Sequence, residues 1–400
     1  MLTSLALIFL VGLSLAAIVG KLKLPRLVGM LVSGILLGPF VLDLLDPTIL
    51  GISAELRRMA LVIILIKAGL SLNIGDLKKV GRPALLMSFL PATFEIAAFV
   101  CFAPLLLGVS RLEALLMGAV LAAVSPAVVV PRMVALMDER RGTDKKIPQL
   151  ILAGASLDDV FVIVLFTAFL TLNTGSSVGM MTFLNIPISI VLGILIGALV
   201  GWGVAFVFEW MHRKGCTVRN TLKVVVLLGI SFLLLAIEGW LEGILAVSGL
   251  LAIMSMAMVF AMRTEGSVVS RLKDKYGKLW LAAEVLLFVL VGAAVDIRYT
   301  LSAGLCAIAM IFVGLVFRSA GVFLCLLGTN LSKKERLYAI FAYLPKATVQ
   351  AAIGGIALSL GLPCGNIILS VAVLDILITA PLGAILMDST KKKLLSNEEY

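Results

Sequence analysis

The stretch GASLDD at residues 154–159 ends in two adjacent aspartates, Asp158 and Asp159, and the chain carries no other charge between residues 147 and 172. An uncharged segment of this length can cross the hydrocarbon core of a bilayer as a helix, which takes about 20 residues. A carboxylate near the bilayer midplane costs roughly 3 kcal/mol or more, so such residues usually serve an ion or proton pathway. We therefore interpret the aspartate pair as a site that holds a cation or a proton.

The composition around this pair is that of a polytopic membrane protein. Of 400 residues, 61% are hydrophobic and 14% are charged, and the mean hydropathy is +1.16. We predict an all-α polytopic fold with about 13 transmembrane helices in a single domain, residues 1–390, followed by a short cytoplasmic tail, residues 391–400. The expected spans fall near residues 2–20, 27–42, 59–75, 84–108, 112–137, 147–173, 180–208, 221–238, 243–262, 279–295, 301–327, 338–360 and 364–387. The first span has no positively charged start and no cleavage site, so we interpret it as a retained helix.

The basic residues follow a membrane topology. Of the 33 Lys and Arg residues, 26 fall in alternate loops and the C-terminal tail, and four fall in the opposite loops. Because Lys and Arg are retained on the cytoplasmic side, this bias places the N-terminus outside and the C-terminus inside, in the inner or plasma membrane. An odd number of spans is what that arrangement needs. Topology explains the formal charge of +10, and we expect no nucleic-acid partner.

The cysteines and the histidine do not predict a resident metal or cofactor. The five cysteines are scattered without metal-ligand spacing, and the only histidine, His212, lies in a basic loop. One histidine cannot build a multi-histidine metal site. We expect no cofactor beyond the transported ions themselves.

Two short echoes suggest an internal repeat. The word ASLDDV at residues 155–160 is echoed by AVLDIL at 372–377, and SPAV at 125–128 is echoed by LPKA at 344–347. The echoing segments lie seven spans apart, and an odd offset inverts their direction in the membrane. We therefore predict inverted repeats of the kind found in secondary transporters: a first repeat of about 1–175, a linker helix of about 180–208 and a second repeat of about 221–388.

Prolines and glycines interrupt the two echoing spans. Pro126 and Pro131 fall in the fifth span, and Pro345 with Gly354-Gly355 in the twelfth. Each removes or loosens helical hydrogen bonds at membrane depth. Paired interrupted helices indicate a transporter's binding site, because freed carbonyls and half-helix ends can coordinate an ion there.

Few ionisable residues remain inside the predicted spans once the loops are set aside. They are Lys67, Glu95, Asp158, Asp159, Glu284, Arg318, Lys346 and Asp375. Each needs a partner or water. Five acids face three bases, so one or two acids should be protonated, hydrated or available to a cation.

The spacing assigns provisional roles to some of these residues. Asp158 and Asp159 point about 100° apart on a helix and should titrate as a coupled unit. Ser156 lies three residues before Asp159 and offers a hydroxyl ligand on the same face; Ser125, at the first helix break, is a further candidate ligand. We expect Glu95 to brace Arg318, and Asp158 to pair with Lys346. Nothing in the spacing of Lys67, Glu284 and Asp375 assigns them a partner.

The residues GASLDD at 154–159, RSAGV at 318–322 and LPKATVQAAIG at 344–354 together resemble the monovalent cation:proton antiporter superfamily in its two-aspartate branch. The likeness is strongest to the sodium/hydrogen exchangers of solute carrier family nine, subfamily B, and their bacterial relatives. It implies two crossed broken helices beside the aspartate helix, in a core that moves against a dimerisation domain of a homodimer. It also implies that Asp159 is the main ion carrier with Asp158 its neighbour, that Lys346 pairs with the first aspartate, and that Glu95 pairs with Arg318.

These observations predict a Na⁺(Li⁺)/H⁺ antiporter that works by alternating access, with Asp158 and Asp159 as the metal ligands. The alternative is a sodium-coupled symporter of an organic anion on a related inverted-repeat fold. A symporter should show clusters of Asn, Gln or Thr at the helix breaks, where Gln350 is nearly alone. An intramembrane aspartyl protease would need its aspartates on separate helices, so we expect no enzyme.

Overall fold

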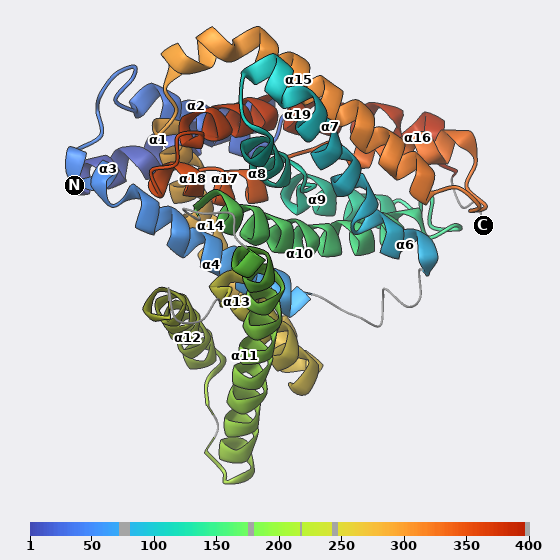
Figure 1. The fold of residues 1–400 in the computed structure, drawn as a ribbon. Coiled ribbons are helices and arrows are strands. Elements are labelled where there is room, and N and C mark those ends of the chain that lie inside the picture. The colour runs from blue at the N-terminus through green and yellow to red at the C-terminus, as the bar shows by residue number, and fades with distance from the viewer. Residues whose placement is uncertain (72–80, 175–179, 217, 242–246, 397–400) are drawn as a thin grey trace. The chain divides into compact units, whose positions relative to one another are not determined.

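The described part of the chain is helical, which confirms the all-α prediction. The computed structural model describes residues 1–71, 81–174, 180–216, 218–241 and 247–396, and these residues contain no strand (Figure 1). The helices are α1 (Leu2–Lys21), α2 (Arg26–Leu37), α3 (Pro47–Gly51), α4 (Ser53–Ser71), α6 (Arg82–Met87), α7 (Leu90–Leu107), α8 (Arg111–Leu121), α9 (Pro126–Asp138), α10 (Ile147–Thr174), α11 (Met180–Arg213), α12 (Asn220–Trp240), α13 (Gly249–Arg263), α14 (Gly266–Ala293), α15 (Ile297–Cys325), α16 (Lys333–Ala342), α17 (Thr348–Ile353), α18 (Ile356–Ser359) and α19 (Gly365–Leu394).

Many of these helices match the membrane spans expected from the sequence. Within the described residues, nine helices are long and apolar enough to cross a membrane, and three shorter apolar helices accompany them at Arg26–Leu37, Gly249–Arg263 and Thr348–Ser359. The shorter helices fall in the predicted spans 27–42, 243–262 and 338–360. The total of thirteen spans stays a prediction.

The chain forms two compact units. The first comprises Met1–Ala54, Asn73–Phe169 and Val285–Tyr400, and the second comprises Glu55–Leu72 and Leu170–Glu284. The first unit contains both predicted helix breaks and the aspartate pair on α10. The functional argument therefore concerns the first unit.

The first helix break lies between α8 and α9. Helix α8 ends at Leu121 and α9 begins at Pro126, with Ser125 extended at φ −90° and ψ 110°. The residue before a proline is pushed away from helical geometry, and Pro126 at the first helical position has no N–H to leave unsatisfied. The interruption therefore follows from the Ser125-Pro126 sequence.

The second helix break lies between α16 and α17. Helix α16 ends at Ala342 and α17 begins at Thr348, with Pro345 in the intervening segment. The start of α17 is capped from within, because the backbone N–H of Ala347 donates to Gln350 Oε1 at 2.9 Å. Both interruptions predicted from the prolines are thus present.

Two glycines allow neighbouring helices to approach the site closely. A Cβ on Gly383 of α19 would lie 2.4 Å from a Pro345 side-chain carbon, and a Cβ on Gly321 of α15 would lie 2.8 Å from the Pro91 Cα in α7. Small residues at such crossings let backbones come together. These contacts bring α19 against the second break and α15 against α7.

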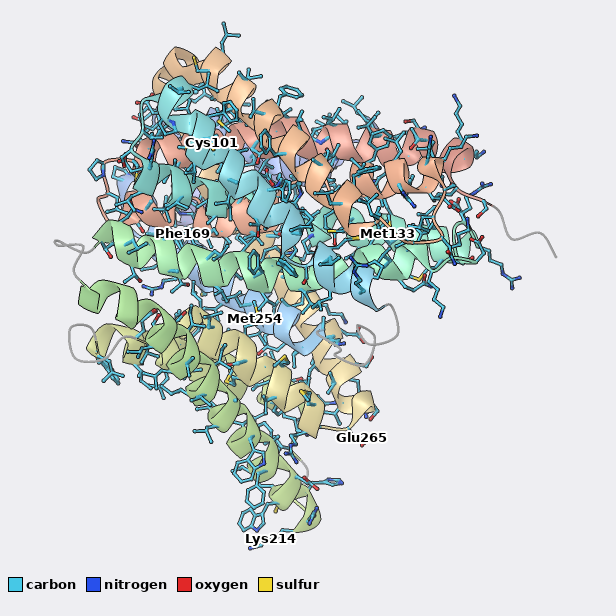
Figure 2. All side chains as sticks on the ribbon, turned by 45° about the vertical axis from the view of Figure 1, so that its right-hand side comes forward. Cys101, Met133, Phe169, Lys214, Met254 and Glu265 are labelled. Atoms are coloured by element: carbon cyan, nitrogen blue, oxygen red, sulfur yellow. The ribbon has the colours of Figure 1, made fainter. Side chains whose placement is uncertain are left out.

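The second unit contains α11, α12 and α13 with most of α4 and α14. Helices α11 and α13 pack closely along a glycine stripe: Cβ atoms on Gly193, Gly197 and Gly201 would lie 2.1–2.6 Å from backbone oxygens of α13 or of Ser248 just before it. Lys214, labelled in Figure 2, follows the end of α11. Its ammonium lies 3.9 Å from the centroid of the Trp210 ring. Tryptophan beside basic residues is typical of the end of a membrane span.

Candidate ion-binding site

The two helix breaks contact each other through hydrogen bonds. The backbone N–H of Ser125 in the first break donates to the carbonyl of Pro345 in the second at 2.8 Å. Gln350 of α17 donates its amide to the carbonyls of Leu121 and Ala123 at 3.3 and 2.6 Å. Carbonyls released by the first break are thus bound by groups of the second, as buried backbone requires.

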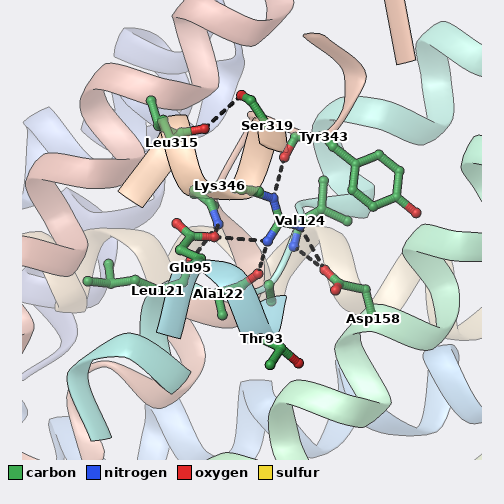
Figure 3. A network of polar contacts seen from close by, with 12 residues as sticks. Thr93, Glu95, Leu121, Ala122, Val124, Asp158, Leu315, Ser319, Tyr343 and Lys346 are labelled. Atoms are coloured by element: carbon green, nitrogen blue, oxygen red, sulfur yellow. Dashed lines mark hydrogen bonds and ion pairs between the residues drawn. The ribbon is translucent and has the colours of Figure 1, made fainter. Parts of the chain in front are cut away.

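Arg318 of α15 joins the members of the polar network beside these breaks, among them Glu95 and Asp158, which Figure 3 labels. Its fully buried guanidinium donates to the Tyr343 carbonyl at 2.6 Å, to Glu95 Oε2 at 2.9 Å and to Asp158 Oδ2 at 3.0 Å. It also donates to the carbonyl of Ala122. The predicted ion pair between Glu95 and Arg318 is present. The planar guanidinium has five N–H donors, so Arg318 can link α15 to both helix breaks and to two carboxylates at once.

Lys346 has a different partner from the one predicted. Its ammonium donates to Glu95 Oε2 at 2.6 Å and to the Leu121 carbonyl at 2.6 Å. The predicted pairing of Lys346 with Asp158 is wrong in this structure. Asp158 Oδ2 instead accepts from Arg318 and from the backbone N–H of Val124 at 2.8 Å. The acid from α7 lies between the two cations and binds both.

The aspartate pair is buried and only partly satisfied. Asp158 is fully buried and Asp159 is 8% exposed. Oδ1 of each has no hydrogen-bond partner among the described residues, and the same holds for the buried hydroxyl of Ser125. Asp159 forms no ion pair with any residue in the described ranges. Unsatisfied buried oxygens of this kind need an explanation, and a site that binds an ion or a proton is one.

The other predicted residues fall in three places. The Ser156 side chain lies outside the described residues, although its backbone belongs to α10. Asp375 of α19 is buried near Lys346, close enough for their charges to interact. Lys67 and Glu284 belong to the second unit, where their charges interact with each other. Six of the eight expected intramembrane charges therefore belong to the first unit.

Some contributors were not singled out from the sequence as site residues. They are the Val124 N–H, the carbonyls of Leu121, Ala122 and Ala123, and the side chain of Gln350. The proline at each break indicates the backbone groups, because an interrupted helix leaves N–H and C=O groups that need partners outside the helix. For Gln350 the signal was an isolated amide in an apolar segment, which needs buried partners.

The donor set suits a hard monovalent cation or a proton better than a resident transition metal. Among the described residues, no three His, Cys, Asp or Glu side chains gather into a metal cluster. The candidate ligands are carboxylate and hydroxyl oxygens next to backbone carbonyls. Oxygen ligands of this kind favour hard cations.

Comparison with known proteins places the chain in a family. The family model of the sodium/hydrogen exchanger transmembrane domain matches residues 5–388. The chain is 34% identical to human sodium/hydrogen exchanger 9B2 over 395 residues, covering 94% of this chain and 71% of that protein. It is 34% identical to the Xenopus tropicalis protein of the same name over 359 residues, covering 87% of this chain but only 65% of that one.

The fold has a solved counterpart. The sodium proton antiporter MjNhaP1 from Methanocaldococcus jannaschii superposes with a TM-score of 0.81 at 22% identity, and the match covers 98% of each chain. The resemblance seen in the sequence motifs is thereby confirmed by the family model, the relatives and the fold. The chain belongs to the sodium/hydrogen exchanger family.

Proposed function

We propose that this protein exchanges Na⁺ or Li⁺ for H⁺ across a membrane by alternating access, with cation and proton competing for Asp158 and Asp159. The observation that carries the proposal is the pair of buried Oδ1 atoms without a hydrogen-bond partner among the described residues. A buried carboxylate oxygen in that condition is stabilised by binding a proton or a cation. The names of the relatives, sodium/hydrogen exchangers, support sodium and hydrogen as the exchanged ions.

The charge distribution supports competition at Asp159 in particular. Glu95 accepts from both Arg318 and Lys346, and Asp158 shares Arg318. Asp159 has no such partner among the described residues, so its charge is uncompensated unless an ion or a proton binds. Moving an uncompensated buried charge through the membrane is costly, which suppresses transit of the empty site. Either occupant removes that cost, and exchange follows.

The proposal extends to ligands and assembly. Asp159 is the main carrier, Asp158 its neighbour, and the hydroxyls of Ser125 and Ser156 complete the oxygen set with backbone from the breaks. The protein acts as a homodimer in the inner or plasma membrane, with the N-terminus outside and the C-terminus in the cytoplasm. Its single domain, residues 1–390, consists of inverted repeats of about 1–175 and 221–388 joined by a linker helix of about 180–208.

The symporter alternative is weakened by the contacts of Gln350. Its amide nitrogen is bound to the Leu121 and Ala123 carbonyls, and its amide oxygen accepts from Ala347. Because both ends of this side chain are used within the protein, neither is available to an organic solute. The described breaks thus favour an ion over an organic anion.

The test is exchange in proteoliposomes that contain a pH dye. An outward Na⁺ or Li⁺ gradient should drive a pH change in wild-type vesicles, and Asp159→Ala should abolish it. Asp388→Asn is the matched control, because that carboxylate pairs with Arg132 and is half exposed; it should retain exchange. Absence of cation-driven pH change in the wild type, or full activity in Asp159→Ala, contradicts the proposal. Repeating the assay under a potassium-valinomycin voltage clamp measures whether exchange carries net charge.

A further inference from the structure

Tyr343 carries a buried hydroxyl that the network around Arg318 does not use. The residue begins the second helix break and is fully buried, and its hydroxyl has no hydrogen-bond partner among the described residues. The rest of the residue is engaged: its carbonyl accepts from Arg318 Nε at 2.6 Å, and the guanidinium lies 5.5 Å from the ring centroid. Buried tyrosine hydroxyls usually find a partner. The Tyr343 hydroxyl is held in place without a hydrogen-bond partner among the described residues.

The hydroxyl lies against α10, one turn before the aspartate pair. A Cβ on Gly154 would lie 2.0 Å from Tyr343 Oη, a contact that no side chain at that position could make. Gly154 therefore leaves the space that the hydroxyl occupies. Asp158 lies four residues later on the same helix face.

Asp158 and Tyr343 each carry a buried oxygen atom that has no hydrogen-bond partner among the described residues. Side chains on an α-helix lean toward its N-terminus, over the preceding turn. A side chain in this direction at position 158 leans over the turn that contains Gly154, and Asp158 Oδ2 binds Arg318 and the Val124 N–H from there. Both Asp158 and Asp159 lie within electrostatic range of the Tyr343 hydroxyl. In the view of Figure 3, Tyr343 and Asp158 lie on one side of the network, with Glu95 and Lys346 on the other.

We propose that the Tyr343 hydroxyl is a ligand of the transported alkali cation, which it shares with the free oxygen of Asp158, and that Gly154 is the residue that admits it. This proposal rests on the cation exchange proposed above. A neutral oxygen adds coordination to a cation without adding charge to the site. The Tyr343 hydroxyl therefore strengthens cation binding at the aspartate pair relative to proton binding. It affects the apparent affinity for the cation and the selectivity among alkali ions.

Tyr343→Phe tests this role with little change of shape. The variant should raise the KM for Na⁺ by roughly tenfold, the factor that 1.4 kcal/mol of lost binding produces, while exchange at saturating Na⁺ is retained. The ratio of the Na⁺ and Li⁺ KM values should change as well, which a purely structural role would not cause. Tyr276→Phe is the matched control, because its buried hydroxyl donates to the Val224 carbonyl at 2.9 Å in the second unit; its KM should equal that of the wild type.

Gly154 supplies a second variant. Gly154→Ala should lower the melting temperature and raise the KM, because the new methyl group displaces the hydroxyl. Combining it with Tyr343→Phe removes the clash with the hydroxyl but leaves the new Cβ 2.9 Å from the Met87 Cβ, so the melting temperature should recover in part while the KM stays high. Equal melting temperatures in the single and double variants would contradict the contact on which the proposal depends.

The outcomes separate this proposal from the proposed function. A wild-type protein that exchanges no cation defeats the exchanger proposal. An active wild type with an unchanged Na⁺ KM in Tyr343→Phe defeats only the tyrosine ligand. If Tyr343→Phe loses transport, the Na⁺ concentration that half-maximally raises its melting temperature is measured instead. A wild-type value there overturns the proposal, and a value about tenfold higher supports it.

Discussion

Lys346, in the second helix break, and Arg318, on α15, donate to one oxygen atom, Glu95 Oε2, at 2.6 and 2.9 Å. All three side chains are buried. Glu95 is therefore the counter-ion of both cations of the network, although it lies on α7, away from the two breaks in the sequence. Its removal leaves the buried Lys346 without an ion-pair partner among the described residues, while Arg318 keeps its pair with Asp158.

Glu95→Gln should destabilise the protein strongly. An ion pair broken on one side leaves an uncompensated buried charge, which costs about 3–5 kcal/mol. The measurement is thermal unfolding in detergent, compared with Glu209→Gln, whose exposed pair with Arg213 should contribute less than about 1 kcal/mol. Equal melting temperatures for the two variants would contradict the shared counter-ion.

Arg318→Lys should not preserve the site, although it preserves the charge. The guanidinium donates to two carboxylates and two carbonyls, from Glu95, Asp158, Tyr343 and Ala122. The lysine side chain is shorter and its ammonium lacks the planar fork of donors, so it cannot make all four contacts. We expect a loss of about 2 kcal/mol or more in stability and at least a tenfold lower exchange rate. A proteoliposome assay with wild-type rates in Arg318→Lys would show that the four-way geometry is dispensable.

Gln350→Glu should loosen the contact between the two breaks. The change keeps the size of the side chain but removes the amide donor that the Leu121 and Ala123 carbonyls accept from. The Leu121 carbonyl still accepts from Lys346, so the Ala123 carbonyl is the one that loses its side-chain partner, and a buried carbonyl left unpaired costs about 1–3 kcal/mol. Faster backbone hydrogen exchange at residues 121–125 is the expected readout, with helix α1 as the internal reference. Unchanged exchange at the first break would count against the cross-break bonds.

The pair of Glu335 and Lys145 should make stability depend on pH. Glu335 lies in the first turn of α16, before its apolar part, and accepts from Lys145 at 2.9 and 3.0 Å. Burial acts to raise the pKa of this carboxyl, but the hydrogen bonds from Lys145 and Ser332 outweigh it and hold the pKa below its usual 4.5. Because folding lowers this pKa, the ionised carboxyl stabilises the folded protein at pH values above its unfolded-state pKa. That stabilisation is lost as the pH falls through the lower, folded-state pKa.

Glu335→Gln should therefore lower the melting temperature at neutral pH, and the difference from the wild type should shrink as the pH falls below about 4.5. Thermal scans from neutral pH down to about 3.5 measure it. Glu139→Gln is the control: Lys391 also lowers the pKa of Glu139, but this group is exposed and screened by solvent, so its effect should be smaller. A constant difference across the range would contradict the linkage.

Cys216 can report the orientation of the membrane topology. It is exposed in the basic loop between α11 and α12, on the side where the excess of Lys and Arg predicts cytoplasm. In a variant with the other four cysteines changed to alanine, a membrane-impermeant maleimide should label inverted membrane vesicles and not intact cells. The reverse pattern would invert the proposed topology.

The sequence sufficed for features that depend on local chemistry. Proline and the residue before it determine where a helix is interrupted, so both breaks were predictable from Pro126 and Pro345. A charged residue in an apolar segment must be buried with a partner, so the polar network could be anticipated from the eight intramembrane charges. Composition alone predicted the all-helical class.

The partners within the network were less accessible to sequence reasoning. A lysine side chain can reach several acids, and which one it meets depends on how α7, α15 and the second break pack together. Local spacing carries no information about that packing, so Lys346 was paired with Asp158 instead of Glu95. The same limit applies to Tyr343 and Gly154. These residues are almost two hundred positions apart, and no periodicity in the sequence predicts their contact.

The hydrogen bonds between the two interrupted helices restrict how the first unit can deform. Ser125 and Pro345 are joined through their backbones, and Gln350 ties two further carbonyls of the first interruption to α17. Bending one interruption alone would break several buried hydrogen bonds at once. Any rearrangement that opens the aspartates to the opposite aqueous compartment must therefore carry both interruptions as a single rigid element, and the hinges for that movement belong in the connections outside them.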